Sequence, residues 1–385
     1  MIIKTSNLYT PYHQEGDRWL KIEDGLIKGI SETPFDTEES VIDLSPYTLT
    51  PGWIEVQING AYGFDFTDDP ANIWEVAEKL AQLGFTTCLP TVITSPKETI
   101  EKALNTWQGG PPEGYLGCQV PGLHLEGPFL NPLKKGAHRL DRIISPDFDF
   151  ISNWNKKNGV QLVTLAPELP GALDIVQELK ERGVVVSAGH SMASGSQAKT
   201  AFDAGISFGT HLYNAMPPLG HRDPGLTGAL LTTDAIPVGL IVDGIHSAPE
   251  MVNLAWRCKG ERGIVLVTDA MAALGKPAGT YQLGGSAVTV TELDARLADG
   301  TLAGSILTPL EAIHLLMVYT GCSFEQALYG WTINPATLMG YTDRGYLAVD
   351  TAADLVVLDQ FESIQAVIIR GQLVYQSMDF SLKQK

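Results

Sequence analysis

The chain has 385 residues and a formal net charge of −18 at pH 7, which argues against a nucleic-acid partner because phosphate backbones are bound by Lys and Arg. No apolar segment has the length and character of a membrane span or of a signal-peptide core, so we expect no membrane partner. The four cysteines are scattered and form no Cys-x-x-Cys pair, which is typical of reduced thiols in a cytoplasmic protein.

The N-terminal segment, residues 1–50, is rich in predicted strands and contains no predicted helix. Residues 19–30 form two alternating runs around Asp24-Gly25, which is a strong hairpin signal. A further strand is predicted at residues 41–44. We therefore expect this segment to lie outside the central domain.

From Pro51 onwards, predicted strands and helices alternate. Strands are predicted at 53–57, 85–91, 117–126 and 160–166, in the two runs that end at His190 and His211, and at 237–243 and 263–268. Helices are predicted at 71–83, 96–107, 172–182 and 194–205. Eight such strands predict the α/β class and a closed (β/α)8 TIM barrel. A doubly wound open sheet is the alternative, weakened because no strand is followed by a dinucleotide-type glycine fingerprint.

After the last barrel strand, the pattern turns back towards strands. Residues 281–304 suggest a small β insertion, residues 309–319 and 324–331 are predicted helices, and strands follow at 354–358 and within 366–375. Because β-rich ends flank the barrel, we expect them to pair with each other. This predicts two domains: a small β-sandwich domain from residues 1–50 plus 345–385, and a catalytic barrel from residues 51–344.

The predicted strand ends carry residues that ligate metals. Glu126, His190 and His211 each end an apolar run, and in barrel enzymes the chemistry lies at the carboxyl ends of the strands. Two histidines and a carboxylate make a catalytic zinc set with one position open for water. A histidine in an apolar run is, by itself, more often a core residue. Three such runs that end in ligand types favour a metal site.

Two further strand ends carry candidates for proton transfer and charge stabilisation. Asp269 is the candidate general acid and base, since a carboxylate beside a metal-bound water can take its proton. A helix cap or turn is the alternative role for this residue. His246 could donate a hydrogen bond to a substrate carbonyl oxygen as negative charge develops there, or it could be structural.

Two loops add basic side chains. Arg222 lies in a Pro/Gly-rich loop, 214–225, where a guanidinium suits phosphate or carboxylate recognition. A surface ion pair with Asp223 explains it equally well. A second basic loop after the third strand is either solvated or faces an anionic substrate; it contains Lys134, Lys135, His138 and Arg139.

Six segments, taken together and in order, carry a family resemblance. They are 51–60 (PGWIEVQING), 124–129 (HLEGPF), 189–191 (GHS), 210–216 (THLYNAM), 243–246 (DGIH) and 267–270 (VTDA). They resemble the N-acetylglucosamine-6-phosphate deacetylase family of the amidohydrolase superfamily. The resemblance covers the whole chain, and the segments at 124–129 and 210–216 are specific to this subgroup.

The resemblance implies a hydrolase of amino-sugar metabolism that converts N-acetylglucosamine-6-phosphate to glucosamine-6-phosphate and acetate. It implies a metal held by Glu126, His190 and His211. Asp269 would act as general base towards a metal-activated water and then as general acid towards the amine. His246 would help to polarise the acetamido carbonyl.

The resemblance also implies how a small phosphorylated amino sugar is bound. Asn214, the backbone of Ala215 and Arg222 match the family's phosphate contacts, and His138 matches a contact to the sugar. The arginine can come from the neighbouring subunit in such enzymes. A homodimer with Arg222 near the subunit interface is therefore implied.

One departure from the superfamily bears on the number of metals. Many amidohydrolases hold a second ion with His-x-His at the end of the first strand, where this chain has Gln57 and Asn59. Neutral amides are poor zinc ligands, so we predict one divalent ion per subunit. Zinc suits two histidines and a carboxylate most readily, and Fe, Co or Mn also suit them.

Two other functions remain open from the sequence. The chain could be another amidohydrolase that acts on a cyclic amide or a different N-acyl substrate. It could also be a metal-free barrel that acts as a binding protein.

Overall fold

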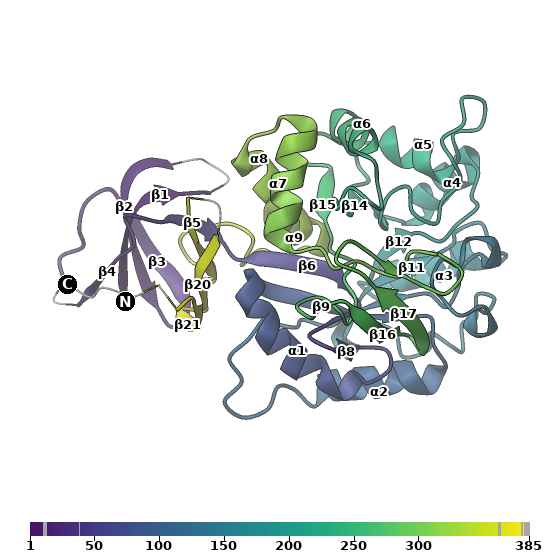
Figure 1. The fold of residues 1–385 in the computed structure, drawn as a ribbon, viewed down its shortest axis with the longest axis horizontal. Helices are drawn as coiled ribbons and strands as arrows, with labels where there is room; N and C mark the ends of the chain where they lie inside the picture. Colours follow the sequence, from purple (N-terminus) through teal and green to yellow (C-terminus); the bar gives the residue numbers. More distant parts are fainter. Residues whose placement is uncertain (11–13, 38, 361–362, 379, 381–385) are drawn as a thin grey trace.

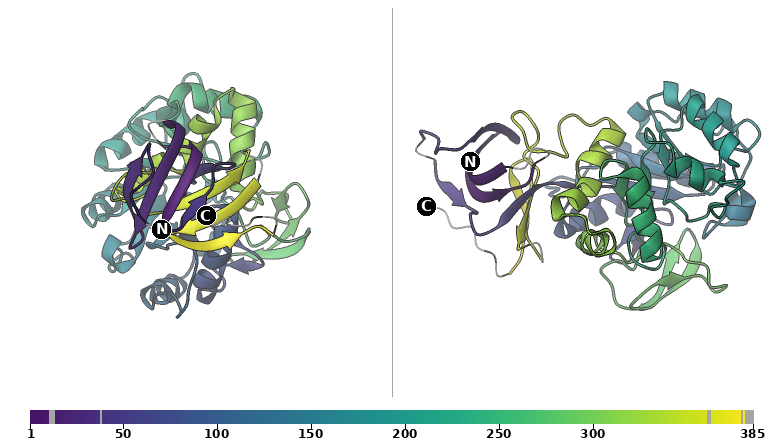
Figure 2. Two further views of the ribbon diagram at one scale, coloured as in Figure 1. Left: turned by 90° about the vertical axis from the view of Figure 1, so that its left-hand side faces the viewer. Right: turned by 90° about the horizontal axis from the view of Figure 1, so that it is seen from above.

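The computed structural model describes residues 1–10, 14–37, 39–360, 363–378 and 380, which form two parts (Figure 1). The larger part is a parallel sheet surrounded by helices, and the smaller part consists of strands from both ends of the chain. Figure 2 shows strands from the two ends of the chain together at one end of the molecule. Among the described helices, none is long and apolar enough for a bilayer crossing.

The larger part is a (β/α)8 barrel. Its strands are, in order around the sheet, β6 (Trp53–Ile58), β9 (Phe85–Ile93), β10 (Leu123–Glu126), β11 (Val160–Leu165), β12 (Val185–Ala188), β13 (Phe208–Gly209), β14 (Val238–Leu240) and β15 (Ile264–Leu266). Beyond β15 the chain returns to β6: the N–H of Asp269 donates to the Gln57 carbonyl at 2.9 Å, and that of Asn59 donates to the Ala270 carbonyl at 2.7 Å. These bonds close the barrel, so the predicted fold class is confirmed and the open sheet is excluded.

Helices cover the outside of the barrel. They are α1 (Ile73–Leu80), α2 (Lys97–Gln108), α3 (Ala172–Glu181), α4 (Gly195–Ala204), α5 (Gly225–Leu231), α6 (Pro249–Lys259), α7 (Pro309–Thr320), α8 (Phe324–Leu328) and α9 (Ile333–Met339). Local sequence fixes their ends. Ser194 forms a capping box with Gln197 at the start of α4. Gly84, in the left-handed conformation at φ 89°, follows the 3-10 turn that extends α1.

The third barrel strand is shorter than predicted. The sequence suggested a strand over 117–126, but β10 begins only at Leu123. Gly122 has a φ of 158°, and a Cβ at this position would lie 2.4 Å from the Gly159 carbonyl oxygen. The chain therefore passes too close to the turn before β11 for an uninterrupted strand, and residue 119 pairs separately with β9.

The small domain is one branched sheet built from both chain ends. Its strands are β1 (Ile2–Leu8), β2 (Gln14–Glu23), β3 (Leu26–Ser31), β4 (Val41–Asp43), β5 (Thr48–Pro51), β19 (Leu355–Asp359), β20 (Ser363–Ile369) and β21 (Gln372–Gln376). The ends join where β5 pairs antiparallel with β19, placing Leu49 opposite Val357. The sheet encloses its own apolar core, which includes Leu20, Ile27 and Leu355. The predicted pairing of the two ends is confirmed, and we propose that the domains divide near residues 51 and 345.

The predicted β insertion is also present. It consists of β16 (Gly279–Leu283), β17 (Ser286–Val290) and β18 (Ala295–Arg296), which form an antiparallel sheet beside the barrel (Figure 1). A small apolar cluster joins this sheet to the barrel, with Leu283 and Val288 packed together with Ile93 and Met271. Near it, β7 (Gly60–Ala61) and β8 (Phe64–Asp65) form a short hairpin.

Candidate active site

The carboxyl ends of the barrel strands surround a cavity of about 380 Å³. The predicted site residues that line it are Asn59, Glu126, His138, His190, His211, Asn214, Ala215, His246 and Asp269. Gln57 lies beneath this lining and is fully buried. Residues from six different strand ends thus meet in one place.

Three of these residues have an unusual backbone conformation. His190, His211 and Asp269 have φ values of 48°, 27° and 47°, in the left-handed region that residues other than glycine rarely adopt. Each follows shortly after a barrel strand, where the chain must turn sharply. Backbone strain of this kind concentrates at functional sites.

The three predicted metal ligands bring their donor atoms together. Nε2 of His190 lies 3.2 Å and Nε2 of His211 lies 3.1 Å from Oε1 of Glu126, and the two nitrogens are 3.1 Å apart. In a tetrahedral zinc site with bonds of about 2.0–2.1 Å, neighbouring ligand atoms are about 3.3 Å apart. The donor atoms are therefore spaced to share one ion.

Hydrogen bonding orients His190 as a ligand. Its Nδ1 lies 2.8 Å from the Lys134 carbonyl oxygen, which can only accept, so Nδ1 carries the proton. The lone pair of Nε2 therefore faces Glu126 and His211. Metal-binding histidines characteristically donate their other N–H to a carbonyl or carboxylate in this way.

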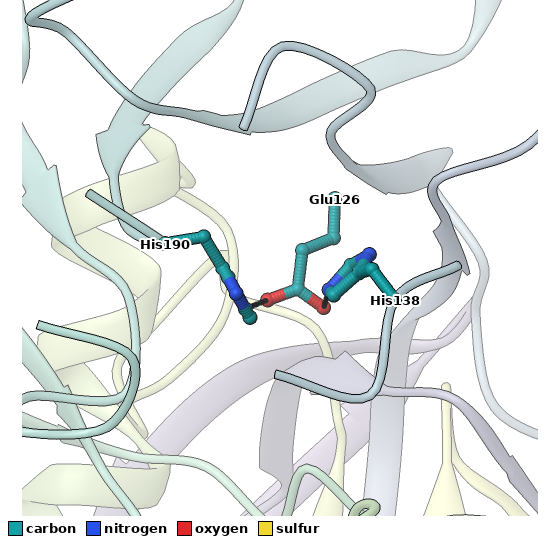
Figure 3. Close-up of side chains that lie close together, drawn as sticks. All are labelled: Glu126, His138 and His190. Atoms are coloured by element: carbon teal, nitrogen blue, oxygen red, sulfur yellow. Dashed lines mark hydrogen bonds and ion pairs between the residues drawn. The ribbon is translucent and has the colours of Figure 1, made fainter. Parts of the chain in front are cut away.

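His138 is a fourth candidate ligand, because it lies close to Glu126 and His190 (Figure 3). Its Nδ1 lies 3.3 Å from the Thr94 backbone nitrogen and 2.8 Å from the Thr94 hydroxyl oxygen. The Thr94 hydroxyl donates to the Glu126 carbonyl at 3.2 Å, so its oxygen can accept from Nδ1–H, and these contacts fit either tautomer of a neutral ring. Burial and then the nearby His190 lower the pKa of His138 to about 3, which favours this neutral ring. Nε2 of His138 lies 3.8 Å from Oε2 of Glu126, whereas Nε2 of His211 lies 3.1 Å from Oε1, so the distances favour His211 as the third ligand.

Glu126 is ionised despite its burial. Desolvation opposes its charge, but the contacts with the imidazoles of His190 and His211 hold its pKa well below the usual value. An anionic oxygen between two imidazole nitrogens is a suitable binding place for a divalent cation.

Asp269 has one oxygen fixed and one oxygen available. Oδ1 accepts hydrogen bonds from the side-chain amides of Asn59 at 2.7 Å and Gln57 at 3.3 Å. An amide oxygen turned towards this carboxylate would be repelled, which supports the assignment of both nitrogens as donors. Burial, followed by the charge of Glu126, raises the pKa of Asp269 to about 6.

His246 is held by a carboxylate of its own. Its Nδ1 lies 2.6 Å from Oδ2 of Asp243, and its backbone N–H donates to Oδ1 of the same residue at 2.8 Å. Burial opposes the charge of Asp243, but the hydrogen bond with His246 lowers its pKa. Asp243 therefore fixes the ring orientation and leaves Nε2 for the cavity.

The predicted phosphate contacts do not all meet in one chain. Asn214 and Ala215 line the cavity, and Ala215 has a φ of 52°. Arg222 is exposed and lies outside the cavity lining. Asp223 accepts hydrogen bonds from the backbone of Gly195 and Gly225, so it serves the loop and not Arg222.

Comparison with known proteins places this site in a family. The family model described as "Amidohydrolase family" matches residues 48–374. The chain belongs to the amidohydrolase family. Membership implies a divalent metal and hydrolytic chemistry, and the donor set of Glu126, His190 and His211 fits such an ion.

Relatives within the amidohydrolase family are similar over nearly the whole chain. The N-acetylglucosamine-6-phosphate deacetylase of Lysinibacillus sphaericus is 37% identical over 367 residues, which is 94% of each chain. The N-acetylgalactosamine-6-phosphate deacetylase of Escherichia coli is 35% identical and covers 97% of this chain and 98% of its own. An Asp-to-Ala variant of the Mycobacterium smegmatis N-acetyl-D-glucosamine-6-phosphate deacetylase, in complex with N-acetyl-D-glucosamine-6-phosphate, aligns with a TM-score of 0.89 at 30% identity, over 98% of this chain and 99% of that chain. These similarities confirm the resemblance to the deacetylases.

Some cavity residues of this amidohydrolase were not predicted from the sequence. They belong to the β insertion and the segment after it, and to the loop after β10: Leu283, Asp299, Thr301, Leu302, Lys134 and Lys135. For the two lysines, the sequence left open whether their loop is solvated or faces an anionic substrate. No sequence pattern marks the other four as site residues; Asp299 and the glycine after it, for example, look like an ordinary hairpin turn. Only the folded position of the insertion makes them part of the site.

Proposed function

We propose that the protein hydrolyses N-acetylglucosamine-6-phosphate to glucosamine-6-phosphate and acetate in amino-sugar metabolism. The observation that carries this proposal is the position of Asp269 in one cavity with the three clustered donor atoms of Glu126, His190 and His211. The fold and the sequence relatives support the same reaction, since several relatives are deacetylases of phosphorylated amino sugars.

Glu126, His190 and His211 would hold a single divalent ion, for which zinc is the best match to two imidazoles and a carboxylate. Fe, Co and Mn also accept this donor set. When bound, the ion supplies a Lewis acid and lowers the pKa of water. Gln57 and Asn59 direct their amide nitrogens at Asp269, so they support the carboxylate and do not form a second metal site.

Asp269 is the proposed general base and general acid. The amides fix Oδ1, which leaves Oδ2 to take a proton from the attacking water. A pKa raised to about 6 makes the carboxylate basic enough to accept this proton. The same oxygen then returns the proton to the amine nitrogen as the C–N bond breaks. His246, oriented by Asp243, is proposed to help polarise the carbonyl oxygen as charge develops there.

The remaining contacts would bind the sugar phosphate. His138 lines the cavity and is proposed to hydrogen-bond to the sugar. Asn214 and the backbone of Ala215 are proposed to contact the phosphate. Arg222 is exposed outside its own cavity, so we infer that it reaches the phosphate of a second copy in a homodimer. The cysteines are unpaired, which favours a reducing compartment such as the cytoplasm.

N-acetylgalactosamine-6-phosphate is a second candidate substrate, because a deacetylase of that sugar is 35% identical over nearly the whole chain. The test is acetate release from both phosphorylated sugars and from unphosphorylated N-acetylglucosamine. The proposal expects the highest kcat/KM with N-acetylglucosamine-6-phosphate. Equal or better turnover of the galactosamine epimer would reassign the substrate. Turnover of a cyclic amide with no acetate from any sugar would favour another amidohydrolase reaction.

A further inference from the structure

The charges that line the cavity raise the question of what binds an anionic substrate. Glu126, Asp269 and Asp299 contribute carboxylates, whereas Lys134 and Lys135 are the lysine or arginine side chains among the described lining residues. Both lysines are half-buried on the loop after β10. The lysine side chains available to a phosphate monoester in this cavity therefore come from one loop of the same chain.

Lys134 is fixed in position by two contacts. Its Nζ donates to the Met216 carbonyl at 2.7 Å, and its own carbonyl accepts from Nδ1 of His190 at 2.8 Å. The ammonium group has three donors, so two remain for another acceptor. A tethered ammonium loses less side-chain entropy on binding than a free lysine does.

The segment that Lys134 reaches offers donors of its own. Ala215, directly before Met216, lines the cavity in the left-handed conformation. Its N–H has no acceptor among the residues that the structure describes. A cation and a free backbone donor thus lie on the same side of the cavity, an arrangement that suits a phosphate group.

Lys135 is placed differently, although it is the next residue. Its Nζ donates to the carbonyl of Gly136, the next residue of the same loop, at 3.1 Å. The ammonium group thus bonds within its own loop and not to the segment that contains Ala215. Lys135 is therefore a matched control of the same residue type in the same loop.

We propose that Lys134 binds the phosphate of the substrate and determines the preference for the phosphorylated over the unphosphorylated sugar. The proposal rests on the proposed function, because it names the residue that recognises that substrate's phosphate. It gives each chain a phosphate-binding cation of its own, in addition to any contribution from Arg222.

The experiment compares the wild-type protein with Lys134→Met, Lys134→Arg and Lys135→Met. Methionine keeps an unbranched stem of similar length, and the backbone carbonyl that binds His190 is unchanged. For each protein, kcat and KM are measured with N-acetylglucosamine-6-phosphate and with N-acetylglucosamine, together with bound metal and inhibition by inorganic phosphate.

We expect Lys134→Met to raise KM for the phosphorylated sugar and the inhibition constant of phosphate by about 10- to 100-fold, the range for a lost charged hydrogen bond. The metal content, kcat and turnover of the unphosphorylated sugar should change little. Lys134→Arg should restore part of the loss, and Lys135→Met should change KM by less than about twofold.

Equal losses with both sugars, or a loss of metal in Lys134→Met, would overturn the proposal in favour of a structural role through His190. If the wild-type protein turns over neither sugar, the proposed function fails, and calorimetric titration with inorganic phosphate still decides the role of Lys134. Unchanged phosphate binding in Lys134→Met would then refute it.

Discussion

The hydrogen bond from Asn59 to Asp269 gives the sharpest prediction of how the site works. Asn59 is 2% exposed, and its Nδ2 lies 2.7 Å from Oδ1 of Asp269. In Asn59→Ala this donor is lost, and the longer contact from Gln57 at 3.3 Å remains. The carboxylate then loses its main orienting contact.

The magnitude follows from the type of bond. Hydrogen bonds to charged groups contribute about 1.5–3 kcal/mol, and each 1.36 kcal/mol is about a factor of ten in rate. If the bond serves to position Asp269 for proton transfer, kcat/KM in Asn59→Ala should fall by about 10- to 150-fold. The number of bound ions per chain should not change, because Asn59 is not one of the proposed ligands.

Acetate release under steady-state conditions, with metal counted on the same samples, is the assay. Asn334→Ala is the matched control: Asn334 is also a buried asparagine with two hydrogen bonds, but they go to the carbonyls of Glu261 and Ile264, far from the cavity lining. This control should lower the melting temperature and leave the kcat/KM of folded protein unchanged. Wild-type kcat/KM in Asn59→Ala, or a fall explained wholly by lost metal, would refute the positioning role.

Two further predictions concern the metal ligands and a buried glutamate, Glu55, in the barrel. His211→Ala should weaken metal binding by more than about 100-fold, which exceeds the effect of losing a residue that only hydrogen-bonds a ligand. His138→Ala should keep the ion. The reverse result in a metal titration would make His138 the ligand. Burial raises the pKa of Glu55, which accepts hydrogen bonds from the N–H groups of Gln57 and Thr268, to about 8. Between pH 4.5, the ordinary pKa of glutamate, and about pH 8, Glu55 therefore binds a proton in the folded state but not in the unfolded state. The free energy of unfolding falls as the pH rises through this range. Relative to Glu55→Gln, the wild-type unfolding free energy should drop by roughly 2 kcal/mol more between about pH 5.5 and about pH 7.5; parallel urea titrations that give equal drops would contradict this.

Much of the fold was predictable because strand and helix patterns in a barrel are local. The strand before Asp269 and the helix α4 have clear apolar patterns and caps, and both were predicted. Helix α5 was not, because all seven of its residues, Gly225–Leu231, are buried and show no polar face. Helix α6, at Pro249–Lys259, was also not predicted, although Pro249 at its first position is a typical start signal.

The site residues likewise fall into those that local sequence identifies and those that only the folded structure identifies. Glu126, His190 and Asp269 could be found because each follows a strand and has a residue type suited to the chemistry. The roles of Lys134 and Asn59 depend on distances between loops, which no spacing in the sequence contains. Arg222 shows the opposite case: its residue type suggested phosphate binding, and the single chain leaves it outside the cavity.

The central claim is that Asp269 moves the proton in a metal-dependent deacetylation. The most direct test compares acetate release from N-acetylglucosamine-6-phosphate by the wild-type protein and by Asp269→Asn, with bound metal measured in both. The account predicts turnover by the wild-type protein with about one ion per chain, and a variant that keeps its ion but loses about 100- to 10,000-fold in kcat. A variant that retains both its ion and its full turnover would contradict the account.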